Sequence, residues 1–379
     1  MNMTRKRLLL SIFFIATIIV GIALVNFRSN EPIPIGFVAG LSGKFSDLGL
    51  DCRRGVEIAI DKVNQAGGID KRQLQLIAMD DGQDEKMAKE AVANLIAQQV
   101  PVIIGHSTSS MSLATLPLIN ASHTLLVSPT SSTPLVENID DNFIRSCTVS
   151  RNAAVLMARY LRDKLGISSI GIIYDLGNRA YTEQWYNAFR KTFLDAGGQR
   201  VESLAFTSKP DIEMLPLVTK MRQEDIEMLV IVANSVDAAL LCQQVRKAGW
   251  QIPLALSDWA ATEQLINLGG RTVEGAIISQ FFNRKSTRPA YLSFKEEFLR
   301  SYKSEPGFGA LHSYNAAMMI FRAMSERQGN ETLKQTILRI AHFQGLQDDI
   351  VINQYGDSNH PTYIGVIENG SFKIFEDFR

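Results

Sequence analysis

Cysteine is scarce in this sequence. The 379 residues include only Cys52, Cys147 and Cys242, and no two of these lie close together in the chain. Zinc ribbons and thiol redox motifs both need cysteines a few residues apart, so neither kind of site is expected. At most one disulfide could form, and an odd number leaves at least one free thiol. We expect all three to be buried packing residues.

Charged residues are also few, at 21% of the chain, and the formal net charge is zero. No stripe of Lys and Arg with interleaved aromatic residues is present, so we expect no binding to nucleic acid. Hydrophobic residues make up 46% of the 379 positions, which is more than one core usually organises. We therefore expect two lobes or domains.

Motifs of enzyme active sites are missing. The five histidines show no metal-binding spacing, and the glycines of residues 36–43 fit neither a dinucleotide nor a phosphate loop. His106 lies among hydroxyl residues, but no acid partner is visible, which favours a structural or ligand-contact role over a general base. We expect no catalysis, cofactor or metal. An exported hydrolase that uses Ser109 or Ser132 is the least favoured alternative.

Four acidic residues cluster in a short stretch without the pattern of a calcium loop. They are Asp80, Asp81, Asp84 and Glu85. Carboxylates stabilise the first turn of a helix, so helix capping explains this cluster better than metal binding.

The N-terminus is a membrane-targeting segment. The basic residues Arg5, Lys6 and Arg7 precede residues 8–25, which carry no charge, and Arg28 follows. Signal peptides have apolar regions of about 7–15 residues, whereas roughly 18 can span a bilayer. The length favours an uncleaved anchor from Leu8 to Val25, and a cleaved signal is the alternative. The preceding basic residues place the globular part outside the cytoplasm, in the periplasm or its equivalent.

Short β-rich stretches alternate with longer amphipathic ones along the rest of the chain. Strands are predicted at residues 33–38, 74–79, 102–105, 124–127, 169–174, 201–206, 228–232, 253–256 and 276–279. Helices are predicted between them, and the last third adds three helices and short strands, with a hairpin at Asn369-Gly370. This alternation predicts an α/β fold with doubly wound parallel sheets and helices on both faces.

Two predicted strands end in runs of hydroxyl residues. Residues 104–110 read Ile-Gly-His-Ser-Thr-Ser-Ser, and residues 127–133 read Val-Ser-Pro-Thr-Ser-Ser-Thr. Either run alone is explained by helix capping. Two runs on neighbouring strands favour an anion site instead, because ligands of open α/β sheets collect beyond the carboxyl ends of the strands. We expect the ligand to carry a carboxylate that binds at this site.

Residues 33–375 contain several short sequence motifs that resemble, in the same order, those of the leucine/isoleucine/valine-binding family of type I periplasmic solute-binding proteins. They are Gly40-Leu41-Ser42-Gly43, Asn64-Gln65-Ala66-Gly67-Gly68-Ile69, Asp80-Asp81, Ile104-Gly105-His106, Ser128-Pro129 and Val273-Glu274-Gly275. The resemblance implies two Rossmann-like lobes joined by three crossovers that form a hinge, at residues 145–150, 281–283 and 345–349. It implies lobe one from residues 33–148 and 283–346, and lobe two from 149–282 and 347–379, after the segment 1–28.

The resemblance also implies a ligand site. Ser109 and Ser132, with the backbone at Thr130, match the groups that hold the α-carboxylate of the ligand. Asp258 matches an acidic residue that pairs with the ammonium, and it directly follows a predicted strand, although from position alone it could equally cap the next helix. The other two expected ligand-binding residues are Asn234 and Tyr181.

Some positions depart from the family pattern. Leu48 and Asn234 each stand where the family often has an aromatic ring, so we expect a less aromatic cleft. The loop at residues 177–180 is longer, which leaves the role of Tyr181 open. These departures keep an amide or another small carboxylate as alternative ligands.

The sequence predicts an exported solute-binding protein that captures an amino acid or similar small zwitterion by closure of two lobes. The implied partner is the permease of an ATP-driven (ABC) transporter. The alternative is a membrane-tethered sensory domain that reports its ligand to a signalling partner.

Overall fold

The structure, a computed structural model, describes residues 31–375. The predicted anchor at residues 8–25 lies outside this part of the chain. Within residues 31–375, no helix combines the length and the apolar character that a bilayer span requires.

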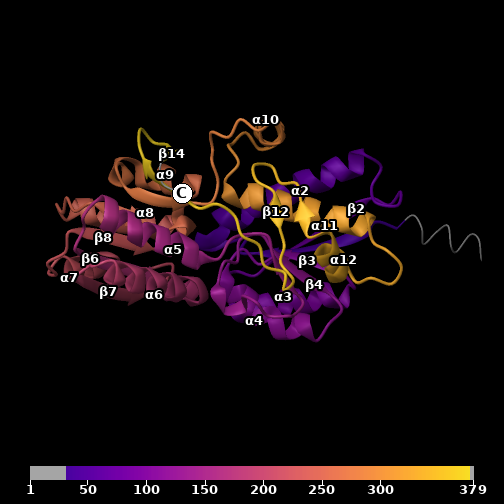
Figure 1. The fold of residues 1–379 in the computed structure, drawn as a ribbon, viewed down its shortest axis with the longest axis horizontal. Helices are drawn as coiled ribbons and strands as arrows, with labels where there is room; N and C mark the ends of the chain where they lie inside the picture. The colour runs from indigo at the N-terminus through magenta and orange to yellow at the C-terminus, as the bar shows by residue number, and fades with distance from the viewer. Residues whose placement is uncertain (1–30, 376–379) are drawn as a thin grey trace, which may run out of the picture.

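Lobe one is built on a five-stranded parallel sheet, seen on the right of Figure 1. Its strands lie in the order β2 (Leu74–Asp80), β1 (Ile33–Ala39), β3 (Val102–Gly105), β4 (Leu125–Ser128) and β5 (Phe143–Arg145). The helices are α2 (Ser46–Gln65), α3 (Glu85–Ala97), α4 (Ser109–Asn120), α10 (Pro289–Tyr302), α11 (Phe308–Ser325) and α12 (Leu333–Ile340).

Successive strand residues of this sheet enter different cores. Phe37 and Ile104 belong to the cluster that contains α2 and α11, whereas Val38 and Ile103 belong to the cluster that contains α3 and α4. Side chains alternate between the two faces of a strand, so these fully buried apolar runs require helices on both faces.

Lobe two is built on a seven-stranded sheet, on the left of Figure 1. Its order is β14 (Phe372–Ile374), β13 (Tyr363–Ile367), β10 (Ile277–Gln280), β9 (Leu254–Leu256), β8 (Met228–Val232), β6 (Ser169–Asp175) and β7 (Arg200–Phe206). Its helices are α5 (Ser150–Arg159), which a π-helical turn extends to Lys164, α6 (Arg179–Asp195), α7 (Leu215–Met221), α8 (Ser235–Lys247) and α9 (Glu263–Gly269). Strands β10 to β7 are parallel.

The two C-terminal strands differ from this parallel arrangement. β13 pairs antiparallel with both β10 and β14. Asn369 and Gly370 connect β13 to β14 with positive φ angles of 54° and 65°, as the predicted hairpin requires.

The chain passes between the lobes three times. The first passage leads from β5 to α5 and the second from β10 to α10, at the positions predicted. The third was expected at residues 345–349. It lies later, between β12 (Ile350–Val351) and β13, because β12 first pairs with β11 (His342–Phe343). Arg145 Nε donates to Asp357 Oδ1 at 2.7 Å and so links the first passage to the third.

The predicted fold class is confirmed, with two lobes, largely parallel sheets and three crossovers. The three cysteines are also as expected, since each is buried and free. The structure adds β5 and β11, which the sequence did not predict, whereas β12 falls within the short strand expected at residues 350–353.

Candidate functional site

A cavity lies between the two lobes. Five of the six predicted site residues line it: Ser109, Thr130, Ser132, Tyr181 and Asp258. The remaining lining residues are Leu48, Ser107, Thr108, Asn178, Trp259, Phe281 and Phe308. Both lobes and the second passage therefore contribute to one site, at the carboxyl ends of the strands, as ligand sites of α/β sheets do.

The wall from lobe one carries hydroxyl groups. The hydroxyl of Thr130 donates to the carbonyl of Ser107 at 2.8 Å, and that of Ser128 donates to the carbonyl of His106 at 2.8 Å. These bonds fasten the loop after β4 to the loop after β3. Among the described residues, no side-chain hydrogen bond occupies the hydroxyl of Ser109 or of Ser132, although both residues are 2% exposed. These two hydroxyls are therefore available to a guest in the cavity.

Capping does not explain the first hydroxyl run. α4 begins at Ser109, and its N-cap residue Thr108 makes no side-chain hydrogen bond to the helix. Thr108 Oγ1 instead donates to Gln83 Oε1 at 2.9 Å. Asn178 Oδ1, from lobe two, accepts from the N–H group of Ser110 at 3.0 Å and so occupies part of the α4 N-terminus. The Ser109 hydroxyl lies at the cavity beside this helix start, an arrangement that suits a negative group.

The wall from lobe two carries a buried acid. Asp258 follows β9, is 1% exposed, and accepts hydrogen bonds from the Tyr181 hydroxyl at 3.0 Å and from the Ser279 hydroxyl at 3.3 Å. Burial raises the pKa of Asp258 to about 6, although the bond from Tyr181 acts in the opposite direction. Within residues 31–375, no Lys, Arg or His forms an ion pair with this carboxylate. Asp258 does not cap α9, whose N-cap residue is Thr262.

The rest of the cavity is apolar and largely aromatic. Phe281 and Phe308 meet edge to face at 5.9 Å between ring centroids, and the Tyr181 ring meets Trp259 in the same way at 5.7 Å. The cavity thus contains the rings of Tyr181, Trp259, Phe281 and Phe308, whereas Leu48 and Asn234 add no ring. Leu48 does line the cavity, but rings from the second passage, from α11 and from the turn after β9 surround it.

Asn234 is not among the residues that line the cavity, and this expected ligand role is corrected. Its side-chain oxygen accepts from the N–H groups of Val236 and Asp237, each at 3.0 Å, so Asn234 is the N-cap of α8. Its amide nitrogen donates to Asp237 Oδ2 at 2.7 Å. Both polar atoms of the Asn234 side chain are thus hydrogen-bonded within the first turn of α8.

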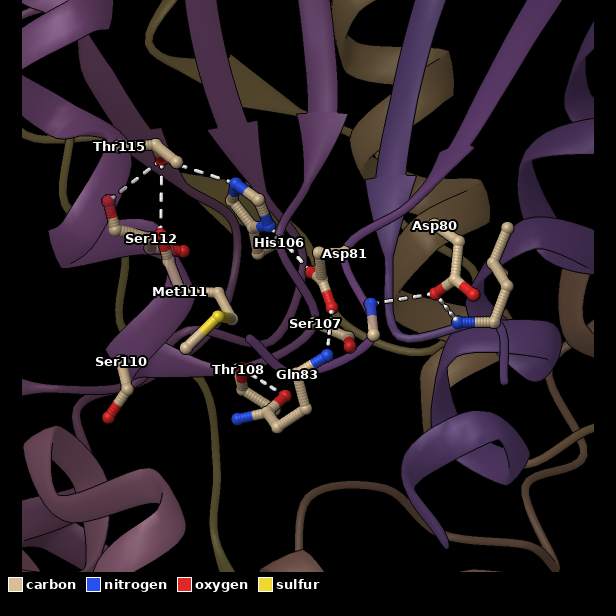
Figure 2. A network of polar contacts seen from close by, with 12 residues as sticks. Asp80, Asp81, Gln83, His106, Ser107, Thr108, Ser110, Met111, Ser112 and Thr115 are labelled. Carbon is tan, nitrogen blue, oxygen red and sulfur yellow. Dashed lines mark hydrogen bonds and ion pairs between the residues drawn. The ribbon is translucent and has the colours of Figure 1, made fainter. Parts of the chain in front are cut away.

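His106 has the acid partner that was not visible in the sequence. Figure 2 shows its ring between Asp81, whose Oδ2 lies 2.7 Å from Nδ1, and Thr115, whose Oγ1 lies 3.2 Å from Nε2. All three residues are fully buried. The hydroxyl beside His106 thus belongs to Thr115, inside α4, and neither Ser109 nor Ser132 is hydrogen-bonded to this histidine in the described part of the chain. The arrangement supports the turn after β3 and does not activate a cavity serine.

The acidic cluster is used in three local roles. Asp84 is the N-cap of α3 and accepts from the N–H groups of Lys86 and Met87. Asp80 accepts from the N–H groups of Leu41 and Gly82, as Figure 2 shows in part, and Asp81 pairs with His106. The interpretation as helix capping is therefore correct for Asp84, whereas Asp80 binds two loop N–H groups and Asp81 forms a buried pair with His106.

Comparison with known proteins agrees with this geometry. The model of the periplasmic binding protein family matches residues 32–371. The Leu/Ile/Val-binding protein homolog 3 of Brucella melitensis is 24% identical over 363 residues, which cover 94% of this chain and 95% of that protein.

Two solved structures share the fold. The branched-chain amino acid transporter substrate binding protein LivJ of Streptococcus pneumoniae, in complex with isoleucine, has a TM-score of 0.83 at 20% identity and covers 91% of this chain and 99% of that one. A solute binding protein of an ABC transporter from R. palustris, in complex with benzoate, has a TM-score of 0.80 at 16% identity, with 91% and 95% covered.

Proposed function

Since this chain belongs to the periplasmic binding protein family, we propose that it captures an α-amino acid between its two lobes outside the cytoplasm. The hydroxyls of Ser109 and Ser132 and the backbone at Thr130 bind the α-carboxylate. Asp258 pairs with the ammonium. Tyr181 holds Asp258 in place by its hydrogen bond, and the apolar rings receive the side chain of the ligand.

One observation carries this proposal: Asp258 is an almost fully buried carboxylate that faces free hydroxyls across a cavity and has no cationic partner among residues 31–375. Burial of an unpaired charge is costly, and the raised pKa of Asp258 reflects that cost. A ligand ammonium would supply the missing positive charge, and its carboxylate would lie toward the two serines.

The lining supports a branched aliphatic side chain. Leu48, Trp259, Phe281 and Phe308 offer apolar contacts without a further charged group. Relatives are named for leucine, isoleucine and valine, and a neighbour of the same fold holds isoleucine. Another neighbour holds benzoate, a carboxylate without an ammonium. Asp258 argues against such a ligand here, because a carboxylate beside benzoate would have no counter-charge.

We further propose that the protein delivers its ligand to the membrane permease of an ABC transporter. The family and the transporter name of the isoleucine-bound neighbour support this role. A tethered sensory domain stays the alternative, and the N-terminal segment decides between tethered and free forms. Mass spectrometry of the N-terminus of the exported protein tests this point, because a cleaved signal would remove residues 8–25 and an anchor would retain them.

The lobe boundaries proposed from the sequence are residues 33–148 with 283–346, and 149–282 with 347–379. Ligand exchange then requires the lobes to rotate about the three passages. Because β12 pairs with β11, we propose that lobe one extends to about residue 351 and that the third passage bends beyond it.

A thermal-shift panel tests the ligand class. The purified protein is heated with each standard amino acid, with their amides, with small dicarboxylates and with benzoate. A ligand at 100 times its dissociation constant adds about 2.7 kcal/mol to the free energy of unfolding. We expect stabilisation by branched-chain α-amino acids. Stabilisation by benzoate or dicarboxylates in their place would contradict the assignment of Asp258.

A further inference from the structure

We infer that Lys44, Phe45 and Asp47 form a clasp that fastens lobe one to lobe two over the ligand cavity and sets the rate at which ligand leaves. The inference rests on the proposed function for its ligand. Its mechanism rests on contacts between the lobes that are separate from the cavity-lining hydroxyls and Asp258. All three residues lie between β1 and the first turn of α2.

Lys44 supplies a charged contact. Its Nζ lies 3.0 Å from Asp237 Oδ1 and donates to the carbonyl of Lys209 at 2.7 Å. The Asp237 side chain is fully buried, whereas that of Lys44 is 19% exposed. Separation of the lobes would leave Asp237 without its only ion-pair partner in the described part of the chain. Because an unpaired buried charge is unfavourable, this contact opposes opening of the lobes.

Asp47 supplies a second polar contact, directed at the starts of two helices of lobe two. Its Oδ2 accepts from the Ser235 hydroxyl at 2.5 Å and from the Thr262 hydroxyl at 2.7 Å. Ser235 is the first residue of α8, and Thr262 is the N-cap of α9. A carboxylate beside the N-terminus of the longer helix α8 is favoured by the helix dipole as well as by the two hydrogen bonds.

Phe45 connects the clasp to the ligand site. Its ring stacks on Trp259, with 6.1 Å between centroids and 12° between planes. Trp259 lines the cavity directly after Asp258. The clasp therefore packs on the outer side of a residue whose inner side faces the ligand, so ligand exit and loss of the clasp are one movement.

Asn234 has a positioning role in this arrangement. Its amide nitrogen donates to Asp237 Oδ2, and the Ser208 hydroxyl donates to the same oxygen. These bonds leave Asp237 Oδ1 directed at Lys44. The residue expected to touch the ligand thus orients the acid that receives the clasp.

The clasp should act on dissociation far more than on association. A bound ligand leaves only when the lobes part, and parting breaks the contacts of Lys44, Phe45 and Asp47 together. Association begins from separated lobes, in which these contacts are not yet made, so its rate depends little on them. Most changes in affinity between related complexes likewise arise in the dissociation rate.

Stopped-flow kinetics with leucine as the probe tests the clasp. Asp47→Ala should release leucine about tenfold faster or more, because two hydrogen bonds to a carboxylate are lost, while association stays within about twofold. Ser46→Ala is the matched control, since the Ser46 hydroxyl donates only to the carbonyl of Gly43 within the same turn. An unchanged dissociation rate in Asp47→Ala would overturn the inference.

A double-mutant cycle separates the clasp from general destabilisation. Lys44→Met, Asp237→Asn and the double variant should show coupled effects on the dissociation rate, because each single change already breaks the ion pair. Additive effects would contradict a direct pairing across the lobes.

Small-angle X-ray scattering distinguishes failure of the clasp from failure of the proposed ligand. If leucine does not bind the wild-type protein, the ligand assignment fails and the clasp is still tested. Each saturated with the best ligand of the thermal-shift panel, Asp47→Ala should have a larger radius of gyration than the wild type and than Ser46→Ala, because the clasp no longer holds the lobes together. Equal values for the three proteins would count against the clasp.

Discussion

The two walls of the ligand cavity differ in charge and in how far apart in the chain their residues lie. The wall of lobe one is neutral, and its hydroxyls come from two turns that lie about twenty residues apart in the chain. The wall of lobe two holds the acid Asp258, supported by Tyr181 from a helix 77 residues earlier in the chain. One wall is assembled mainly by local turns, and the other by tertiary packing.

This difference has an energetic counterpart. The pKa of Asp258 rises from 3.8 to about 6 on burial, and a shift of this size costs the unliganded protein about 3 kcal/mol near neutral pH. The uncharged hydroxyls of Ser109 and Ser132 carry no comparable penalty. The buried charge of Asp258 thus lowers the free energy of unfolding of the unliganded protein. We expect a bound ammonium to restore this free energy.

The largest expected effect comes from removing the charge of lobe two. Asp258→Ala should weaken amino-acid binding by about 2–5 kcal/mol, because a buried ammonium would be left without its counter-charge. Isothermal titration calorimetry with the best ligand of the thermal-shift panel measures the change. Unchanged affinity would show that Asp258 does not contact the ammonium.

The same residue should limit stability in the absence of ligand. Asp258→Asn should raise the free energy of unfolding by up to about 3 kcal/mol at pH 7.5, since the buried charge is removed. The pKa of Asp258 is higher in the folded state, so the wild type loses stability as pH rises from about 4 to about 6. The advantage of the variant should appear over that range and vanish below it. Urea unfolding at several pH values measures it, and an equal gain in Ser132→Ala would contradict the contrast between the walls.

The hydroxyls of lobe one should matter for binding alone. Ser109→Ala or Ser132→Ala should each weaken binding by about 1.5–3 kcal/mol, the range for a hydrogen bond to a charged group. Neither should stabilise the free protein as Asp258→Asn does. Calorimetry and thermal unfolding of the same samples check both points, and normal binding in both variants would mean that the carboxylate lies elsewhere.

Acid should weaken binding through lobe two. The ammonium needs the charged form of Asp258, whose pKa is about 6 in the free protein, so affinity is full well above pH 6 and falls as pH drops below it. Between pH 7 and pH 5 the charged fraction falls about tenfold, and affinity should fall by the same factor. Titrations across this range in wild type and in Asp258→Asn measure the slope. A slope that persists in Asp258→Asn would assign the titration to another group.

The smallest expected effect concerns the support of Asp258. Tyr181→Phe removes the hydroxyl that donates to this carboxylate, which should raise the pKa of Asp258 further and weaken binding by about 0.5–1.5 kcal/mol at pH 7. Tyr186→Phe is the matched control, because the Tyr186 hydroxyl contacts Ser203 at an exposed position away from the cavity. An upward shift of the pH midpoint only in Tyr181→Phe is the result that supports this role.

Local patterns in the sequence predicted the wall of lobe one well. The alternation of strands and helices predicted the fold class, and the hydroxyl runs after β3 and β4 predicted a polar wall at the ligand site. The family resemblance then selected Ser109, Thr130 and Ser132 within these runs. These features depend on near neighbours in the chain. Asn234 also had a local signal, because an Asn before a helix that begins Ser-Val-Asp suits an N-cap, and the family pattern led to the wrong role.

Contacts between distant segments could not be predicted in the same way. Phe281 and Phe308 come from the second passage and from α11, so their position at the cavity depends on how the lobes pack. The acid partner of His106 lies 25 residues earlier, after β2, which β1 separates from β3 in the sheet. The clasp joins Asp47 to Ser235, 188 residues away. The periodicity and spacing of residues in a single sequence do not show which of these distant residues come into contact.

The most direct test of zwitterion recognition is a matched pair of ligands that differ only in the ammonium. Calorimetry would compare the best amino acid, beginning with leucine, with its deaminated analogue, 4-methylpentanoate. The two cavity walls predict that leucine binds at least about a hundredfold more tightly than 4-methylpentanoate, and that Asp258→Ala removes most of this difference. Equal binding of the two compounds, or a preference for the deaminated acid, would contradict the account.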